Sequence, residues 1–204
     1  MKKILCGLLV FIMAVSLLTA CGENSRPLDA EGSSGNPSTG TKRTDVVVGV
    51  NLSMNTLDPM HALQRPEQEI LDNVQDTLLL LVDGSYQGNL AEHFSVSEDG
   101  MQITIKLREG IKFHNGDELT TEDIAYTYDS LSQSTLFAND ATYYDRTEIM
   151  DDYNCVIHAA VQNPLFMLTL CNVNIISEQA VNELAGDYAM NPVGTGAYKF
   201  VSYD

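Results

Sequence analysis

The sequence predicts an α/β protein of the α+β type, with mixed or antiparallel sheets. Stretches with strand periodicity and stretches with helix periodicity are interspersed along the chain. The pairs Asp99-Gly100 and Asn115-Gly116, which favour tight turns, flank a region expected to form a hairpin. A composition of 44% hydrophobic and 19% charged residues among 204 is typical of a globular chain.

The N-terminal residues have the order of a bacterial lipoprotein signal. Two lysines precede an apolar run from Ile4 to Leu18, which is shorter than the roughly 20 residues of a membrane-spanning helix. The sequence Leu18-Thr19-Ala20-Cys21-Gly22 then matches a lipobox, in which the Cys thiol receives diacylglycerol before cleavage. We therefore expect residues 1–20 to be a signal peptide and Cys21 to hold the protein on the outer face of the cytoplasmic membrane, the periplasmic side in a Gram-negative cell. An ordinary signal peptide with a chance Cys is the alternative.

A polar segment follows the proposed anchor. Residues 23–44 are rich in Gly, Ser, Asn, Thr and Pro and contain few large apolar side chains. Such a segment cannot bury enough apolar surface to offset its ordering entropy. We expect residues 21–44 to form a flexible tether between the anchor and the folded body.

The sequence of the first half of the body predicts one strand, one helix and a second strand. Residues 46–50 are a short apolar run typical of a buried strand. Pro66 favours the first turn of a helix over 66–81, and Asp83-Gly84 ends it. Residues 101–107 alternate between apolar and polar side chains, as in a half-buried strand. The apolar stripe of the helix consists of Ile70, Leu71, Val74, Leu78 and Leu81.

The second half predicts two helices and two strands. Thr120 and Asp123 resemble a capping box, so a helix should follow. The inward side chains of that helix are expected to be Ile124, Tyr128 and Leu131. Residues 154–161 and 197–201 read as strands. Residues 177–185 read as a short helix capped by Ser177 and ended by Gly186.

The charge and the absence of catalytic motifs exclude several functions. Asp and Glu outnumber Lys and Arg by 28 to 11, which argues against a nucleic-acid partner because phosphate contacts need clustered basic residues. No serine-hydrolase elbow or zinc-binding helix motif is present, so we expect no enzyme activity, no cofactor and no metal. The acidic residues between 145 and 152 are expected to form a solvated loop, and His114 to be exposed. Cys155 and Cys171 are expected to be core thiols, with a disulfide as the alternative.

Four ordered segments resemble the extracellular solute-binding proteins of family 5, the dipeptide-, oligopeptide- and nickel-binding receptors of ABC importers. The third segment, residues 97–123, is the most specific. Two positions depart from the family pattern: Phe94 stands for a usual Trp and Ala197 for a usual Pro, and both changes keep size or turn character. The segments are Thr56-Leu57-Asp58-Pro59, residues 73–92, SEDGMQITIKLREGIKFHNGDELTTED at 97–123, and Asn191-Pro192-Val193-Gly194-Thr195-Gly196-Ala197-Tyr198-Lys199-Phe200.

The resemblance implies a periplasmic-binding-protein-like type II fold of two lobes. Residues 45–74 would begin lobe I, residues 75–190 would form an inserted α+β subdomain, and residues 191–204 would re-enter lobe I. Gly194 and Gly196 would let the backbone turn there. The loop after Leu-Asp-Pro faces the ligand in peptide-binding relatives, which implies solute contacts by Ala62, Leu63 and Gln64; an ordinary solvent-facing loop is the alternative.

The resemblance also implies a function and a set of partners. The protein would act as a monomer that captures a peptide or other small solute and passes it to the permease subunits. Because family members are more than twice this length, we expect the chain to be a truncated form that binds solute poorly and exposes a sheet edge. A secreted lipoprotein serving as a structural or interaction module is the alternative.

Overall fold

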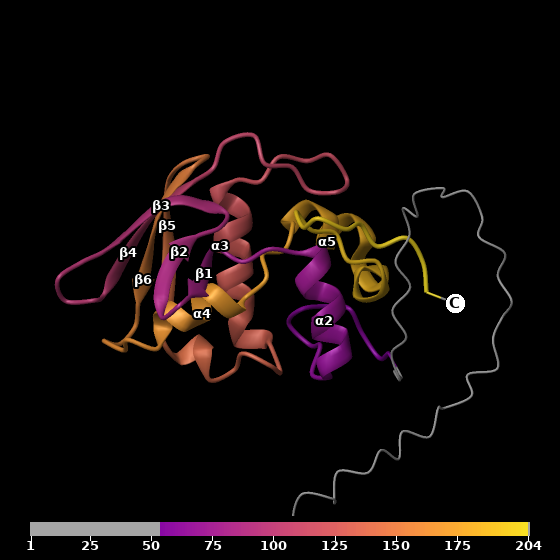
Figure 1. Ribbon diagram of the computed structural model, residues 1–204, viewed down its shortest axis with the longest axis horizontal. Coiled ribbons are helices and arrows are strands. Elements are labelled where there is room, and N and C mark those ends of the chain that lie inside the picture. Colours follow the sequence, from indigo (N-terminus) through magenta and orange to yellow (C-terminus); the bar gives the residue numbers. More distant parts are fainter. Residues whose placement is uncertain (1–53, 204) are drawn as a thin grey trace, which may run out of the picture. The chain divides into compact units, whose positions relative to one another are not determined.

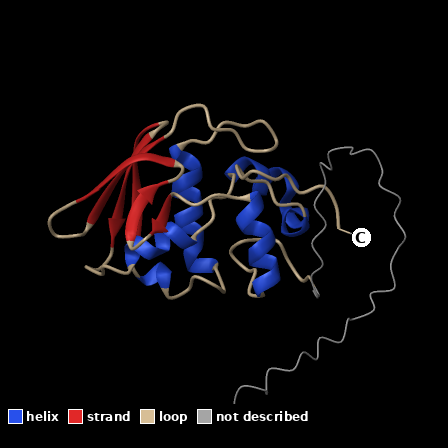
Figure 2. Cartoon of the chain, in the orientation of Figure 1, coloured by secondary structure: helices blue, strands red, loops and turns tan. Residues whose placement is uncertain are grey.

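The computed structural model describes residues 54–203. The signal peptide, Cys21, the tether and the expected strand 46–50 lie outside the described residues. The part that is described falls within one compact unit, which contains helices and two antiparallel sheets (Figures 1 and 2).

The larger sheet has four strands in the order β3-β4-β6-β5, and every neighbouring pair is antiparallel. The Asp99-Gly100 turn joins β3 to β4, as the sequence predicts, with Gly100 at a positive φ of 70°. The Asn115-Gly116 turn instead closes a small loop of its own, through a bond of 2.8 Å from Phe113 N to Asp117 O. The strands are β3 (Ala91–Val96), β4 (Gln102–Leu107), β5 (Tyr144–Asp151) and β6 (Asn154–Ala159).

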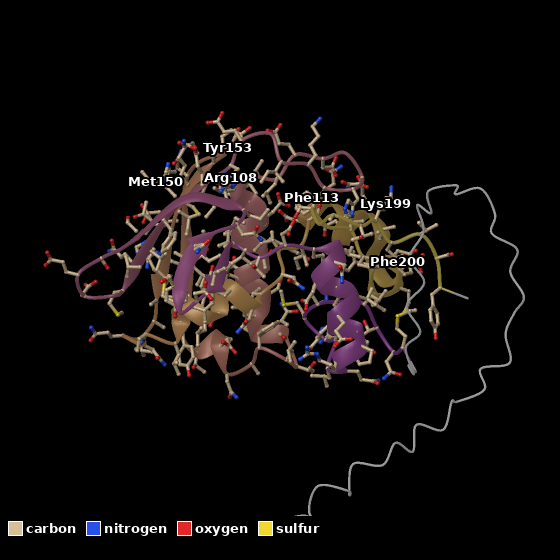
Figure 3. All side chains as sticks on the ribbon, viewed as in Figure 1. Arg108, Phe113, Met150, Tyr153, Lys199 and Phe200 are labelled. Carbon is tan, nitrogen blue, oxygen red and sulfur yellow. The ribbon has the colours of Figure 1, made fainter. Side chains whose placement is uncertain are left out.

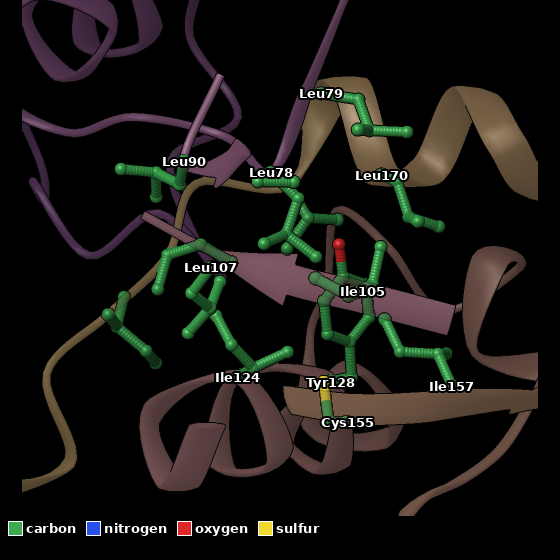
Figure 4. Close-up of a cluster of buried hydrophobic side chains, with 14 of the residues drawn as sticks. Leu78, Leu79, Leu90, Ile105, Leu107, Ile124, Tyr128, Cys155, Ile157 and Leu170 are labelled. Atoms are coloured by element: carbon green, nitrogen blue, oxygen red, sulfur yellow. The ribbon is translucent and has the colours of Figure 1, made fainter. Parts of the chain in front are cut away.

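The alternation predicted for residues 101–107 is confirmed. Ile103, Ile105 and Leu107 of β4 are buried, whereas Gln102 and Thr104 on the other face are exposed. The buried face meets helix α3 (Thr121–Asp129), whose inward side chains complete the main core (Figure 4). These inward side chains, with Leu131 just beyond the helix, are the predicted set Ile124, Tyr128 and Leu131, each at 0% exposure.

Helix α3 begins where the capping box predicts. The Asp123 carboxylate accepts a hydrogen bond of 3.0 Å from the Thr120 main-chain N–H, which has no partner within the helix. The same carboxylate accepts a second bond of 3.1 Å from Glu178 N, at the start of helix α5 (Glu178–Leu184). Asp123 therefore joins the beginnings of two helices.

The helix predicted over 66–81 is wrong in its second half. Helix α2 spans Arg65–Val74, and the following leucines form strand β1 (Leu79–Val82), paired with β2 (Ser85–Gly88). Asp83 and Gly84 adopt positive φ values of 50° and 75°, which suits a two-residue hairpin turn. The leucines fit both helix and strand periodicity, and the hairpin turn at Asp83-Gly84 favours the strand.

Two C-terminal predictions, the end of α5 and the strand over 197–201, are also wrong. The start of α5 is as expected, because Ser177 caps it by accepting a bond of 3.1 Å from Ala180 N. The residue that ends the helix with a positive φ is Ala185, at 46°, and not Gly186, and the chain continues as a 3-10 helix (Ala185–Met190). Residues 197–201 form no strand, because Gly196 N and Tyr198 N bond instead to carbonyls at the end of α2, Val74 O and Asn73 O.

Several elements were not expected from the sequence. The acidic segment 145–152 was expected to be a loop, but most of it forms β5, an edge strand with largely exposed side chains. Its solvation is as expected, although its conformation is not. Helix α4 (Phe166–Asn172), which packs on β1, was also not predicted from the sequence.

The two thiols are free, as the sequence favours. Cys155 belongs to β6 and lies in the core beside Tyr128, and burial raises its pKa to about 12 (Figure 4). Cys171 is partly exposed on α4, and its Sγ donates to Met167 O.

Candidate ligand pocket

The Gly194-Thr195-Gly196 segment packs directly against the end of α2. A Cβ atom built on Gly194 would lie 2.2 Å from Val74 O, and one on Gly196 would lie 2.6 Å from Val74 C. Neither glycine has a positive φ, so a tight turn is not what requires them. The two glycines are needed because the backbones approach too closely for any side chain.

His114 also holds the same segment. Its main-chain N–H donates to Gly194 O at 2.9 Å, and its Nε2 lies 2.8 Å from Gly196 O. Lys199 Nζ donates to the His114 carbonyl at 3.2 Å; Phe113 and Lys199 are labelled at this junction in Figure 3. The expectation that His114 is exposed is therefore wrong, because the ring is hydrogen-bonded to the glycine segment and is partly buried.

The loop after Leu57-Asp58-Pro59 is fixed at both ends. Asp58 Oδ1 accepts from Met60 N at 2.9 Å, and the Ser134 hydroxyl donates to Met60 O at 2.6 Å. The buried Glu67 carboxylate accepts from Asn55 N at 2.7 Å and from Gln64 N at 3.1 Å. A loop tied in this way presents its side chains in a set arrangement.

The three side chains predicted to contact solute lie in different environments. Leu63 is 61% exposed, and Gln64 is partly exposed where α2 begins. Ala62 is fully buried because it packs with Leu57 and Leu71, so its side chain is not available at the surface. Leu63 and Gln64 therefore keep accessible side chains and Ala62 does not, and none of the three lines the pocket between α2, the β1–β2 hairpin and α4.

A pocket of about 510 Å³ opens beside this loop. Its walls come from α2 and the residues after it, the β1–β2 hairpin, the loop after Ser134, and α4. The lining residues are Pro59, Arg65, Gln68, Leu71, Asp72, Gln75, Asp76, Thr77, Leu80, Asn89, Leu136, Phe137, Cys171, Asn172 and Asn174. Most of these residues carry no local signal in the sequence, because they meet only after the hairpin and α4 have packed.

Three amide side chains of the lining are oriented by the protein itself. Each donates an N–H to a main-chain carbonyl, which leaves its side-chain oxygen as the group that can accept a bond. Gln75 is the most constrained: it is 2% exposed, it also donates to the Tyr188 hydroxyl, and its Oε1 has no partner within residues 54–203. The three bonds run from Gln68 Nε2 to Ala62 O (3.1 Å), from Gln75 Nε2 to Val193 O (3.3 Å) and from Asn89 Nδ2 to Thr77 O (3.1 Å).

Two carboxylates add negative charge to the pocket. Asp76 Oδ2 accepts a bond of 2.8 Å from the Thr195 hydroxyl. Partial burial raises the pKa of the Asp72 carboxyl above its ordinary value, with Arg65 opposing this shift and Glu69 adding to it. Arg65, the one cationic side chain of the described lining, pairs with Glu69 at 2.9 Å.

Curated proteins are similar to this chain in sequence. The glutathione-binding protein GsiB of Salmonella paratyphi A is 30% identical over 170 residues, covering 78% of this chain and 32% of the relative. GsiB of Escherichia coli O157:H7 is 29% identical over 166 residues, with the same coverage of both chains. The chain thus spans about a third of the length of the curated relatives it matches.

Solved structures agree on the fold. The substrate-binding protein CtaP of Listeria monocytogenes matches with a TM-score of 0.67 and 27% identity, over 76% of this chain and 33% of that one. An oligopeptide ABC transporter substrate-binding domain from Bacillus anthracis gives a TM-score of 0.69 at 20% identity, over 76% and 35%. The predicted fold class is confirmed, since these neighbours are bilobed periplasmic binding proteins.

The family comparison agrees with the relatives. No helix within residues 54–203 has the length and hydropathy that a membrane span requires. Residues 85–204 match the description "Bacterial extracellular solute-binding proteins, family 5 Middle". The chain therefore belongs to the bacterial extracellular solute-binding proteins of family 5.

Proposed function

We propose that the chain serves as the substrate-binding lipoprotein of an ABC importer, capturing peptides or a related small solute outside the membrane and delivering them to the permease. The match of residues 85–204 to family 5 carries this proposal. The pocket beside the loop 60–65 supplies a place for part of a solute. The named relatives bind solutes rather than transform them, so we propose no enzyme activity.

The domain division is part of the proposal. Residues 45–74 and 191–204 would belong to lobe I, and residues 75–190 would be inserted between them. An insertion of this kind must leave and re-enter its parent lobe at neighbouring points. The contact of Gly194 and Gly196 with the end of α2 supports this arrangement, because it brings the two ends of the insertion together.

The anchor at Cys21 is proposed from the lipobox alone. Replacing Cys21 with Ser should remove lipid attachment and release the protein from the membrane fraction, because the thiol is the acceptor. Metabolic labelling with palmitate and fractionation would measure this. Equal labelling of the Cys21→Ser variant would contradict the anchor while leaving the transport role open.

The transport role is tested by uptake. Cells that lack the chain should lose uptake of a radiolabelled peptide from a panel that includes glutathione, and the full chain supplied in trans should restore it. Leu63→Asp should reduce the restored uptake, since Leu63 is the exposed side chain of the loop. A matched control is Leu165→Asp, whose side chain is 54% exposed and lies outside the loop 60–65.

Unchanged uptake without the chain would favour the alternative, a secreted lipoprotein acting as a structural or interaction module. A cooperative thermal transition and a monodisperse monomer, combined with unchanged uptake, would be the expected properties of such a module.

A further inference from the structure

We propose that Asn115 is a deamidation site whose reactivity is set by the loop 113–117, and that its conversion to a carboxylate weakens the hold of this loop on the glycine segment 194–196. The inference goes beyond the proposed function and does not depend on it. Its support is the pair Asn115-Gly116, the hydrogen bonds of the loop and the position of the Asp117 carboxylate.

Asn115 precedes a glycine, as no other asparagine of the sequence does. Deamidation begins when the main-chain nitrogen of the following residue attacks the side-chain Cγ, and glycine has no side chain to hinder that attack. The new N–C bond closes a succinimide ring, and ammonia leaves with the proton that the main-chain nitrogen has lost. Water then opens the ring at either carbonyl carbon, giving aspartate or isoaspartate. The reaction thus takes up water and releases ammonia, and it needs no other reactant.

The loop leaves Asn115 accessible to water but engages both reacting groups in other bonds. Asn115 and Gly116 are exposed. The Gly116 N–H, which must lose its proton, donates to Phe113 O at 2.9 Å. Asn115 Oδ1 accepts from Asp117 N at 3.2 Å, and Asn115 Nδ2 donates to the Asp117 carboxylate. The Gly116 nitrogen is free to attack only when these bonds break, so the reaction requires local opening of the loop.

His114 makes that opening more costly, because it ties the loop to the glycine segment. Its main-chain N–H donates to Gly194 O at 2.9 Å, and its Nε2 lies 2.8 Å from Gly196 O. Its carbonyl accepts from Lys199 Nζ at 3.2 Å. The rate of conversion of Asn115 should therefore depend on whether the loop is bound to residues 194–196.

Deamidation would turn an attraction between positions 115 and 117 into a repulsion. The Asn115 amide donates to the Asp117 carboxylate, whereas an aspartate at position 115 would place a second carboxylate beside the first. Isoaspartate would also lengthen the main chain within a loop that the bond of 2.8 Å from Phe113 N to Asp117 O closes. Either product should weaken the loop and its contacts with residues 194–196.

The first experiment compares the folded and the unfolded chain. The full chain is incubated in mildly alkaline buffer with and without denaturing urea, and peptide mapping by mass spectrometry separates Asn115 from its aspartate and isoaspartate products. We expect conversion to be about tenfold slower in the folded chain, because opening costs several hydrogen bonds. Gly116→Ala, measured in urea, is the control and should slow the conversion. Equal rates in the folded and unfolded chain, or a rate in urea that Gly116→Ala does not change, would overturn the proposal.

The second experiment loosens the contact with the glycine segment. Lys199→Met removes the bond to the His114 carbonyl and should raise the rate in the folded chain about twofold, without changing the rate in urea. Lys106→Met is the matched control, since Lys106 pairs with Glu92 at 2.6 Å on the strands β4 and β3 and should not affect Asn115. Circular dichroism checks that both variants fold. A folded-state rate in Lys199→Met equal to that of the wild type would contradict control by the glycine segment.

The third experiment measures the consequence of the new charge. Asn115→Asp carries the carboxylate of the product, and urea denaturation should show its folding equilibrium constant reduced about fivefold. Asn115→Ser loses the same donor without gaining a charge, so its loss should be smaller. An Asn115→Asp variant as stable as the wild type, or as stable as Asn115→Ser, would overturn the weakening of the loop by deamidation.

Discussion

The Thr195 hydroxyl donates a hydrogen bond of 2.8 Å to the Asp76 carboxylate, across 119 positions of sequence. Asp76 also lines the candidate pocket. The glycine segment and the pocket are thus joined by this polar contact. A change at Thr195 should affect both stability and the position of a pocket carboxylate.

Thr195→Val should lower the free energy of unfolding by about 1 kcal/mol, because it removes a partly buried hydrogen bond to a carboxylate and keeps the side-chain volume. Urea denaturation of the full chain measures this. Thr195→Ser, which retains the hydroxyl, is the control and should lose less. A loss in Thr195→Ser with no loss in Thr195→Val would show that the methyl group, and not the hydrogen bond, stabilises the segment.

Gly194→Ala and Gly196→Ala should each destabilise the protein by about 1–3 kcal/mol or more, because the added methyl group collides with main-chain atoms of α2 that cannot rotate away. Gly186→Ala is a matched control, since a Cβ there meets nothing within 4 Å and its φ is not positive. Chemical denaturation midpoints would measure the difference. A Gly194→Ala variant as stable as Gly186→Ala would contradict the close approach.

Tyr128→Phe should leave the stability unchanged or raise it slightly. The Tyr128 hydroxyl is buried without a partner in the described residues, so its removal relieves an unmade bond and keeps the ring. Tyr188→Phe is the contrasting variant, because the Tyr188 hydroxyl accepts from Gln75 Nε2 at 3.1 Å. That variant should lose about 1 kcal/mol in the same thermal or urea measurement. A larger loss in Tyr128→Phe than in Tyr188→Phe would reverse the expectation.

Asp123 should make part of the stability depend on pH. Burial raises its pKa above the ordinary 3.8, against the opposing bonds from Thr120 and Glu178. The folded state therefore holds this proton more tightly than the unfolded state, so the contribution is fully present below 3.8 and is lost as the pH rises through the folded pKa.

The comparison is with Asp123→Asn, which cannot titrate. The stability of the wild type relative to this variant should increase as the pH falls from 7 toward 3.8, because other carboxyl groups cancel in the difference. Urea titrations at several pH values measure it. A difference that stays constant, or that shrinks as the pH falls, would contradict the raised pKa.

The sequence predicts those parts of the fold whose signals are local. The alternation in β4 and the Thr120–Asp123 cap are each specified within a few residues, and both are confirmed. The leucines at 78–81 satisfy helix and strand patterns equally, so the β1–β2 pairing could not be read from periodicity. The segment 197–201 has the composition of a strand, but its main-chain groups bond to the end of α2.

The candidate site was predictable only in part. The loop with Leu63 and Gln64 could be named because the family resemblance points to it. Asp72, Gln75 and Asn89 could not, because each is an ordinary polar residue until folding orients it. The orientation of their amides depends on carbonyls that are distant in sequence, as with Gln75 and Val193.

The way α2 ends bears on the order in which the protein folds. The carbonyls of Asn73 and Val74 receive their hydrogen bonds from Tyr198 and Gly196, more than a hundred residues later in the sequence. During synthesis, the carbonyls at the end of α2 therefore stay bonded to water until these late partners are made. Strands β4 and β6 and helix α3 can pair and pack before that. Closure of this long loop is a late step of folding, since its entropy cost is recovered only when the last contacts form.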